Sequence, residues 1–210
     1  MGYTIIIADL VASRRLAGRA QFQRRLKTVL QGVNAQAGRA LASPYTLTLG
    51  DEFQAVYRDA TSVFADIMSI QAQIAPVQAR FAVAAGPLAT NVNPAQAIGM
   101  DGPAFHRARA LLEQLKREKR LFGVQTTDTP DWTLPGGALA VLSGITEGWL
   151  PKRFEVFAGL LSGLSGPELA KKTDITVRAV NKNIRAADLD EWKRILDDIA
   201  RSLNEEIKAR

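Results

Sequence analysis

The chain has no cysteine and a single histidine, His106, among its 210 residues. The lack of cysteine excludes disulfide bonds, thiolate zinc sites and cysteine nucleophiles, and it fits a reducing cytoplasm. One histidine gives little support to a histidine metal cluster or to a serine–histidine–aspartate triad. Any metal site must therefore use aspartate and glutamate oxygens, which suit Mg²⁺, Mn²⁺ or Ca²⁺.

Long apolar runs are also absent, since no stretch approaches the about 20 residues that a membrane-spanning helix requires. The N-terminus does not resemble a signal peptide, because no basic region precedes its apolar stretch and Asp9 interrupts that stretch. We therefore expect a cytoplasmic protein with no membrane partner. Apolar residues make up 47% of the chain, which is typical of a protein with a folded core. The net charge of +6 favours anionic partners such as nucleotides or nucleic acid.

The first half of the chain alternates strand and helix patterns. Residues 3–8 form a continuous apolar run, which is typical of a strand buried on both faces. Two β-type runs at 45–49 and 53–57, around a short Gly/Asp turn, predict a β-hairpin. The resulting order, β-α-β-β-α-β-α-β, predicts an α+β fold with a ferredoxin-like, split-βαβ sheet. The remaining elements of this order are helices at 19–37, at 60–74 and after Pro103, and strands at 79–85 and 121–125.

A segment rich in Thr, Asp, Pro and Gly separates this half from an all-helical remainder. We expect a sheet domain at 1–126, a linker at 127–137 and a helical helix-turn-helix domain at 138–210. Within the helical part, Ser165 and the glutamate three residues later form a capping box, and Thr176 caps the next helix. Two short capped helices joined by a tight turn fit a helix-turn-helix.

The second helix of this motif is the candidate nucleic-acid surface. Residues 171–185 hold five basic residues and one acid, Asp174. We expect this helix to bind DNA, because its outer side chains suit contacts to phosphates and base edges. These side chains belong to Thr176, Arg178, Asn181, Lys182 and Arg185. The alternative is a helical bundle that packs or dimerises through the same segment.

Asp9 and Asp51 form the second candidate site. Asp9 directly follows the first strand and Asp51 lies at the hairpin turn, so both belong to neighbouring strands of a split-βαβ sheet. Two converging carboxylates are costly to hold together unless a cation neutralises them. Mg²⁺ or Mn²⁺ together with a nucleoside triphosphate would do so. The alternative interpretation makes Asp51 a turn residue and Asp9 a surface carboxylate or helix cap.

Three stretches carry a family resemblance. Residues 8–14, ADLVASR, resemble the first metal motif of class III nucleotidyl cyclases. Residues 49–54, LGDEFQ, resemble both the cyclase hairpin and the GGDEF signature of diguanylate cyclases, with leucine in place of the first glycine. Residues 80–86 and the helix after Pro103 are similar to the fourth strand and next helix of those palm domains. Together with the helical C-terminal segment, the chain resembles the SatD family throughout its length.

The resemblance implies a palm-like sheet domain with particular residue roles. Asp9 and Asp51 match the two metal-binding aspartates, which implies Mg²⁺ or Mn²⁺ as cofactor. The residues expected near the triphosphate are Leu10, Val11, Ala12 and Ser13 after the first strand, and Gly50 and Glu52 at the hairpin.

The match fails on the helix after Pro103. Class III cyclases carry an asparagine and an arginine there, whereas this chain has His106 and Ala110, with Arg107 and Arg109 close by. The resemblance therefore implies metal–nucleotide binding, or another phosphoryl transfer, more directly than cyclisation. His106 is a candidate phosphate donor, although a lone histidine on a helix is more often structural.

These observations leave three candidate functions. The first is a cytoplasmic DNA-binding regulator whose palm-like domain binds a divalent metal and a nucleotide. The second is a metal-dependent nucleotidyl or phosphoryl transferase of cyclase type, and whether the protein is an enzyme stays open. The third is a degenerate palm that acts as a dimerisation platform. Related palm domains place the active site near a subunit interface, which implies a homodimer.

Overall fold

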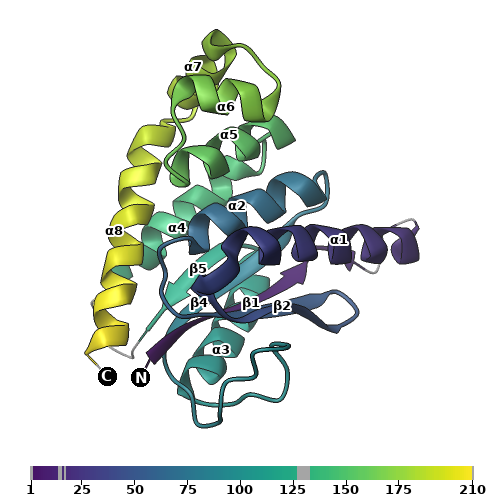
Figure 1. Ribbon diagram of the computed structural model, residues 1–210, viewed down its shortest axis with the longest axis vertical. Helices are drawn as coiled ribbons and strands as arrows, with labels where there is room; N and C mark the ends of the chain where they lie inside the picture. Colours follow the sequence, from purple (N-terminus) through teal and green to yellow (C-terminus); the bar gives the residue numbers. More distant parts are fainter. Residues whose placement is uncertain (1, 14–15, 17, 127–132, 210) are drawn as a thin grey trace.

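The computed structural model describes residues 2–13, 16, 18–126 and 133–209. This part of the chain has a five-stranded sheet and eight α-helices (Figure 1). Its elements, in chain order, are β1 (Gly2–Leu10), α1 (Arg19–Ala37), the 3₁₀ turn η2 (Gly38–Ala40), β2 (Leu41–Leu49), β3 (Glu52–Tyr57), α2 (Val63–Ile74), β4 (Ala79–Pro87), α3 (Pro103–Glu118), β5 (Phe122–Gln125), α4 (Thr133–Thr146), α5 (Pro151–Leu161), α6 (Gly166–Thr173), α7 (Val177–Ala186) and α8 (Leu189–Lys208). Over the same described residues, no helix combines the length and apolar character needed to cross a membrane.

The strands lie in the order β2-β3-β1-β4-β5. β1 pairs antiparallel with both β3 and β4, β2 pairs antiparallel with β3, and β5 lies parallel to β4. Because β3 lies between β1 and β2, the unit β1-α1-β2 is a split βαβ, as the order of sequence patterns predicted. The register pairs Asp9 with Glu52 on one side and with Arg80 on the other, so these three residues lie side by side across three strands.

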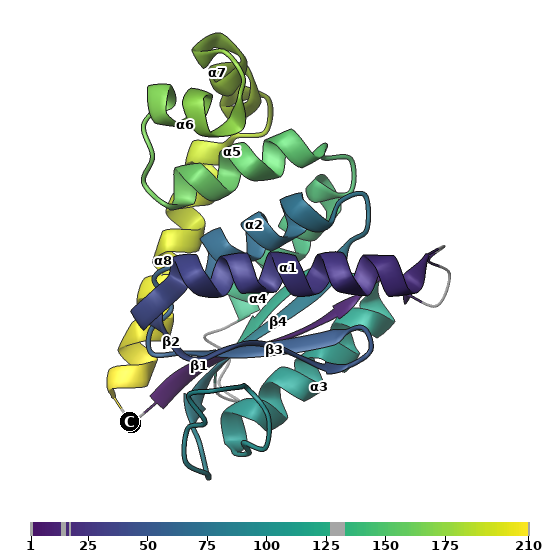
Figure 2. The same cartoon turned by 45° about the vertical axis from the view of Figure 1, so that its right-hand side comes forward.

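Helices cover both faces of the sheet. Successive residues of a strand point to opposite faces, so Ile6 and Ala8 of β1 share a core with α1 and α2, whereas Ile5 and Ile7 pack against α3. Figure 2 shows α1 and α2 on one side of the sheet and α3 on the other. β1 is therefore buried on both faces, which explains its continuous apolar run.

The C-terminal helices continue the core on the α1–α2 side. α5 packs on α2, and α6 and α7 lie beyond α5, at the end of the molecule remote from the sheet (Figure 1). Phe157 of α5 and Leu203 of α8 are fully buried and belong to the same apolar cluster as Ile6 of β1. α8 contacts α7, α5, α2, β1 and β4, and Asn204 Oδ1 accepts a hydrogen bond from the Ala60 amide at 2.7 Å. The predicted division into two domains stays a prediction, and the two halves share one core.

The segment expected to be a linker is in part helical. α4 begins at Thr133, so residues 133–137 belong to a helix, while 127–132 lie outside the described residues. Pro135 stands in the first turn of α4, where a backbone N–H has no intrahelical partner in any case. The Pro and Gly content that suggested a linker is therefore compatible with a helix start.

β2 is longer than predicted, since it begins at Leu41 and not at Tyr45. Its pairing with β3 shifts register on both sides of Ser43, and Pro44 follows at once. Proline has no N–H for a strand ladder, so it occurs at edge strands and irregularities such as this one. The early part of β2 was missed because Pro44 breaks the β-type pattern.

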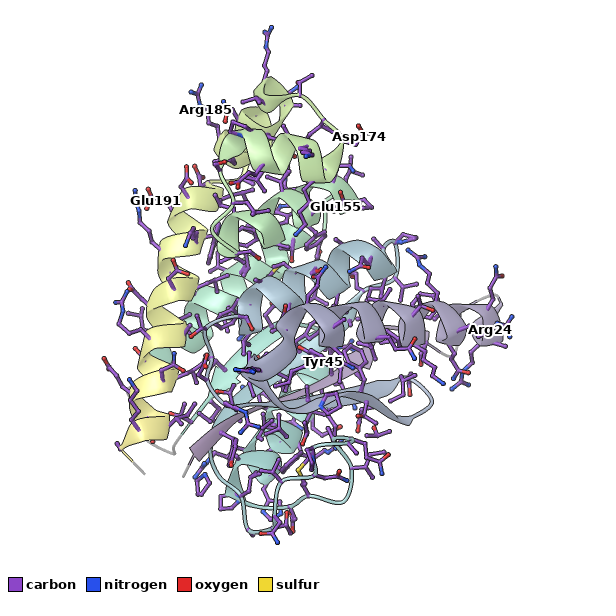
Figure 3. The ribbon with its side chains drawn as sticks, viewed as in Figure 1. Arg24, Tyr45, Glu155, Asp174, Arg185 and Glu191 are labelled. Atoms are coloured by element: carbon purple, nitrogen blue, oxygen red, sulfur yellow. The ribbon has the colours of Figure 1, made fainter. Side chains whose placement is uncertain are left out.

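A polar network is buried between α1, α2 and the sheet. The Tyr57 hydroxyl donates to Asp66 Oδ2 at 2.7 Å and lies 3.2 Å from the Tyr45 hydroxyl. Ser62 Oγ donates to the same carboxylate oxygen at 3.1 Å. Burial raises the pKa of Asp66, and the hydrogen bonds from Tyr57 and Ser62 lower it by less. Figure 3 places Tyr45 between α1 and the sheet.

The Asp66 carboxyl should make the protein less stable as the pH rises. Its pKa in the folded state lies above the ordinary value of 3.8, so the folded protein binds this proton more tightly than the unfolded chain. The contribution is fully present below that ordinary value and is lost as the pH rises through the folded pKa. Asp66→Asn keeps an acceptor for Tyr57 and should remove this pH dependence. Urea midpoints measured between about pH 4 and pH 7 test it, with the exposed Asp198→Asn as control. Parallel curves for wild type and Asp66→Asn would contradict the prediction.

Phe157→Ala should destabilise the whole chain and not only the helical end, because Phe157 is fully buried in the shared core. The expected loss is about 3–5 kcal/mol in the free energy of unfolding. Chemical denaturation followed by circular dichroism and by tryptophan fluorescence measures it, and the two transitions should coincide. The control is Leu150→Ala, whose side chain is 73% exposed and whose effect should stay within about 0.5 kcal/mol. Two separate transitions in the wild type would show that the halves unfold independently.

Candidate functional site

Asp9 is the last residue but one of β1 and lies on the α3 face of the sheet, between Arg80 of β4 and Lys116 of α3. Arg80 Nη1 lies 3.6 Å from Asp9 Oδ1, and Lys116 Nζ lies 3.4 Å from Asp9 Oδ2. Burial raises the pKa of Asp9, and the charges of Lys116 and Arg80 lower it by less. Within the described structure, Asp9 Oδ1 and Arg80 Nε are buried atoms with no hydrogen-bond partner. The carboxylate is thus close to two cations without being fully satisfied by them.

Glu52, the neighbour of Asp9 on β3, is held by the same helix. The Arg109 guanidinium of α3 donates to Glu52 Oε2, and the Thr48 hydroxyl lies 3.2 Å from Oε1. The hydrogen bond to Glu52 raises the pKa of Arg109, which stays a cation. Arg109 and Lys116 are seven residues apart, a spacing that brings both to one face of a helix. α3 therefore places Arg109 beside Glu52 of β3 and Lys116 beside Asp9 of β1.

Asp51 lies in the turn between β2 and β3, next to the end of β1. Ser13 Oγ donates to Asp51 Oδ2, and the Leu10 amide donates to Asp51 O at 3.1 Å. Gly50 has a φ of 58°, a left-handed conformation that favours glycine. Arg19 Nη2 lies 3.0 Å from where a Cβ on Gly50 would be, so a side chain there would also displace Arg19. No described hydrogen bond or ion pair joins Asp51 to the Asp9 carboxylate.

The segment after β1 offers fewer free amides than its predicted role suggests. Leu10 is buried in the core and its amide bonds to Asp51, while the Val11 amide donates to Gln78 O at 2.8 Å. Ala12 is exposed with a φ of 54°, and Ser13 is buried. Among the four predicted residues, only the amides of Ala12 and Ser13 are outside the described backbone bonds. Their contact with a phosphate stays a prediction.

The side chains around Asp9 and Asp51 suit a divalent ion only if phosphate groups bind together with it. The described residues contain no group of three or more metal-ligating side chains. Asp9 and Asp51 supply two carboxylates, and Asp9 Oδ1 accepts no hydrogen bond, although Arg80 Nη1 lies 3.6 Å from it. Arg80 and Lys116 would repel a bare divalent ion, whereas phosphate oxygens would both complete its ligand set and neutralise these two cations. The arrangement therefore matches a metal–nucleotide complex better than a free metal.

Sequence reasoning missed Arg80 and Lys116 and noted Arg109 only for its closeness to a cyclase position. A signal was present in the strand pattern, because Arg80 is a charged residue in an otherwise apolar run. The spacing of seven between Arg109 and Lys116 is a second signal. His106 lies elsewhere: its Nε2 is 2.8 Å from Asp101 Oδ1, and its side chain is 71% exposed. Ala110, at the other cyclase position, is also exposed.

α6 and α7 form the second candidate site. Both predicted caps are present: the Ser165 amide donates to Glu168 Oε2 at 2.7 Å, and Thr176 Oγ1 accepts from the Ala179 amide at 3.1 Å. Val180 is fully buried against the preceding helices. The five predicted DNA-binding residues are all exposed and line one surface depression, here named the α7 surface: Thr176, Arg178, Asn181, Lys182 and Arg185. That α6 and α7 act as a DNA-binding helix-turn-helix stays a prediction.

Comparison with known protein families identifies the family of this chain. The model of the SatD family matches residues 3–203. The chain belongs to the SatD family. No curated protein matches this SatD chain. Among solved structures, a bacterial light-regulated adenylyl cyclase is similar at 13% identity with a TM-score of 0.45, over 59% of this chain and 74% of that one. The guanylyl cyclase Cya2 is similar at 13% identity with a TM-score of 0.44, over 54% of this chain and 70% of that one. Likenesses of this degree assign no activity to the SatD chain.

Arg80→Met should destabilise the protein by about 2–3 kcal/mol, because it leaves the buried Asp9 with one cation fewer, although Lys116 remains. Adding Asp9→Asn should recover part of the loss, since the uncompensated charge is then gone. Urea unfolding of both single variants and the double variant gives the coupling energy. The control is Arg117→Met, which removes an exposed cation from α3, the helix that carries Lys116. A loss in Arg80→Met no larger than in the control contradicts the prediction.

Proposed function

We propose that this SatD protein binds a nucleoside triphosphate with Mg²⁺ or Mn²⁺ at the sheet edge beside Asp9 and Asp51. The observation that carries the proposal is the buried Asp9 carboxylate, which has one oxygen without a hydrogen-bond partner and two cations beside it. A polar atom in that condition is costly in a folded protein and calls for a ligand, water or ion. A metal–nucleotide complex supplies both signs of charge that the site can accept.

The site has negative groups that suit the metal ion of such a ligand and positive groups that suit its phosphates. The carboxylates of Asp9 and Asp51 suit the metal, whereas Arg80, Arg109 and Lys116 suit the phosphate oxygens. Guanidinium groups bind phosphate through paired donors, and a lysine acts as a point charge. The Lys116 side chain is 34% exposed and is shared between Glu113 at 2.7 Å and Asp9 at 3.4 Å. Its partial exposure leaves Lys116 accessible to a phosphate that binds beside Asp9.

The nature of the ligand rests on the motifs. Residues 8–14 and 49–54 resemble the segments with which class III cyclases hold metal and triphosphate. The same two segments carry Asp9, Ser13 and Asp51, and the Ser13–Asp51 hydrogen bond joins one segment to the other. This agreement between motif and contact supports a triphosphate over other small anions.

A metal-dependent nucleotidyl or phosphoryl transferase is the second candidate function for the same site. Paired carboxylates beside several cations are also the arrangement that two-metal phosphoryl transfer uses. Cyclisation has less support, because the cyclase asparagine and arginine positions hold His106 and Ala110, and His106 pairs with Asp101. Release of pyrophosphate or phosphate from a nucleotide, lost in Asp9→Ala and Asp51→Ala, would identify a transferase. The expected homodimer and cytoplasmic location remain predictions beside either function.

Nucleotide binding should require the metal, and metal binding should require the nucleotide, because Arg80 and Lys116 repel a bare divalent ion. Isothermal titration of ATP and of GTP, with and without Mn²⁺, measures this. Asp9→Asn and Asp51→Asn should each weaken the ternary complex about tenfold or more, since each removes a charged ligand worth at least 1.4 kcal/mol or so.

The control for these variants is Asp198→Asn, an exposed aspartate of α8 that pairs with Arg201. It should bind as the wild type does. No nucleotide binding by the wild type with Mn²⁺ present, or unchanged binding in Asp51→Asn, overturns the proposal. The sheet domain would then be left as a dimerisation platform, which sedimentation of the purified protein would examine.

A further inference from the structure

The α7 surface plays no part in the sheet-edge site and has a charge pattern of its own. Arg178, Lys182 and Arg185 follow one another at spacings of four and three residues, so they form one stripe along the helix. None of the three makes an ion pair or side-chain hydrogen bond with another described residue. The ten residues of α7 include no aspartate or glutamate.

Of the three cations, only Arg185, in the last turn, lies where the dipole of α7 favours a positive charge. Like charges three and four residues apart destabilise a helix. Arg178 is the second residue of α7, where the positive end of the helix dipole disfavours a cation. On α8, by contrast, Arg194 pairs with Glu191 and Arg201 pairs with Asp198. The stability of the fold does not explain the stripe, so we look for an anionic partner.

The helix is held firmly with the stripe facing outward. Val180 anchors the inner face of α7 in the core. Lys152 Nζ donates to Thr173 O at 2.7 Å, which ties the end of α6 to α5, and Arg153 Nε donates to Asn183 Oδ1 at 3.4 Å, which ties α7 to α5. Figure 3 shows Arg185 at the outer end of the molecule, away from the sheet. The three cations therefore lie on the exposed side of a helix whose inner side is attached to α5.

We infer that α7 enters the major groove of duplex DNA. A helix of α7's ten residues is about 15 Å long, and the B-form major groove, about 12 Å wide, admits one helix. The stripe from Arg178 to Arg185 covers eight residues, or seven steps along the helix, and spans about 10 Å, which is longer than one phosphate and matches a regular row of them. Around the stripe, Asn181 offers an amide suited to adenine, and Val177, 42% exposed at the start of α7, offers an apolar contact to a thymine methyl group. The inference does not depend on nucleotide binding at the sheet edge.

The test is fluorescence anisotropy of the full chain with a labelled, random-sequence duplex of about thirty base pairs over a range of salt concentrations. The variant replaces the stripe: Arg178→Gln, Lys182→Gln and Arg185→Gln together. Each lost phosphate contact should lower the slope of log K against log salt by about one, and the affinity should fall roughly tenfold per contact at about 0.1 M salt. The melting temperature should not fall, because repulsion within α7 is relieved.

The matched control removes three exposed cations elsewhere, by Arg24→Gln, Lys27→Gln and Arg39→Gln on α1 and η2. It should change the salt slope by less than one unit. A loss in this control equal to that in the stripe variant would mean diffuse attraction to any polyanion and would overturn the inference. So would an absence of duplex binding by the wild type at low salt. Binding of an acidic polyglutamate peptide as tight as that of the duplex would overturn the choice of DNA in favour of an acidic protein surface.

Discussion

The arrangement of this protein depends on β1, a strand covered by helices on both faces. Its pairing with β3 and β4 fixes where Asp9, Glu52 and Arg80 lie relative to one another. A carboxylate at the end of such a strand is partly withdrawn from water, so nearby groups must balance its charge. Arg80 and Lys116 do this incompletely and leave one oxygen without a hydrogen bond. The candidate site is thus a consequence of where the central strand ends.

The two candidate sites treat positive charge in opposite ways. At the sheet edge Arg80, Arg109 and Lys116 each lie beside a carboxylate, which suits a compact ligand that brings both a metal ion and phosphates. On α7 the cations have no acid to pair with in the described structure, which suits an extended partner of one sign. Both arrangements carry an electrostatic cost in the free protein, and each ligand would relieve the cost at its own site. The net charge of +6 alone does not distinguish the paired cations at the sheet edge from the unpaired cations on α7.

Local patterns in the sequence predicted what local physics determines. The bounds of α1 and α7, the run of β1 and the caps at Ser165 and Thr176 all follow from short-range periodicity and hydrogen bonding. The candidate site was predicted only in part. Asp9 and Asp51 stood out because they interrupt strand patterns, but their partners are distant in the sequence. That Lys116 lies beside Asp9 depends on which face of the sheet α3 covers, and a single sequence does not contain that information.

α8 bears on how the two ends of the molecule could influence each other. Its 20 residues span about 30 Å and run from α7 back to the strands, where Asn204 bonds the segment that follows β3 and Ile207 packs against Gly2. Along this path α8 also contacts α5, α2, β1 and β4, so it links the two ends of the described structure directly. α8 thus connects α7 to the segment that follows β3. A tilt imposed on α7 would be transmitted through α8 to this end of the β2–β3 hairpin, whose turn carries Asp51. Any communication would then be mechanical and carried through the body of the protein, without a swing of one half against the other.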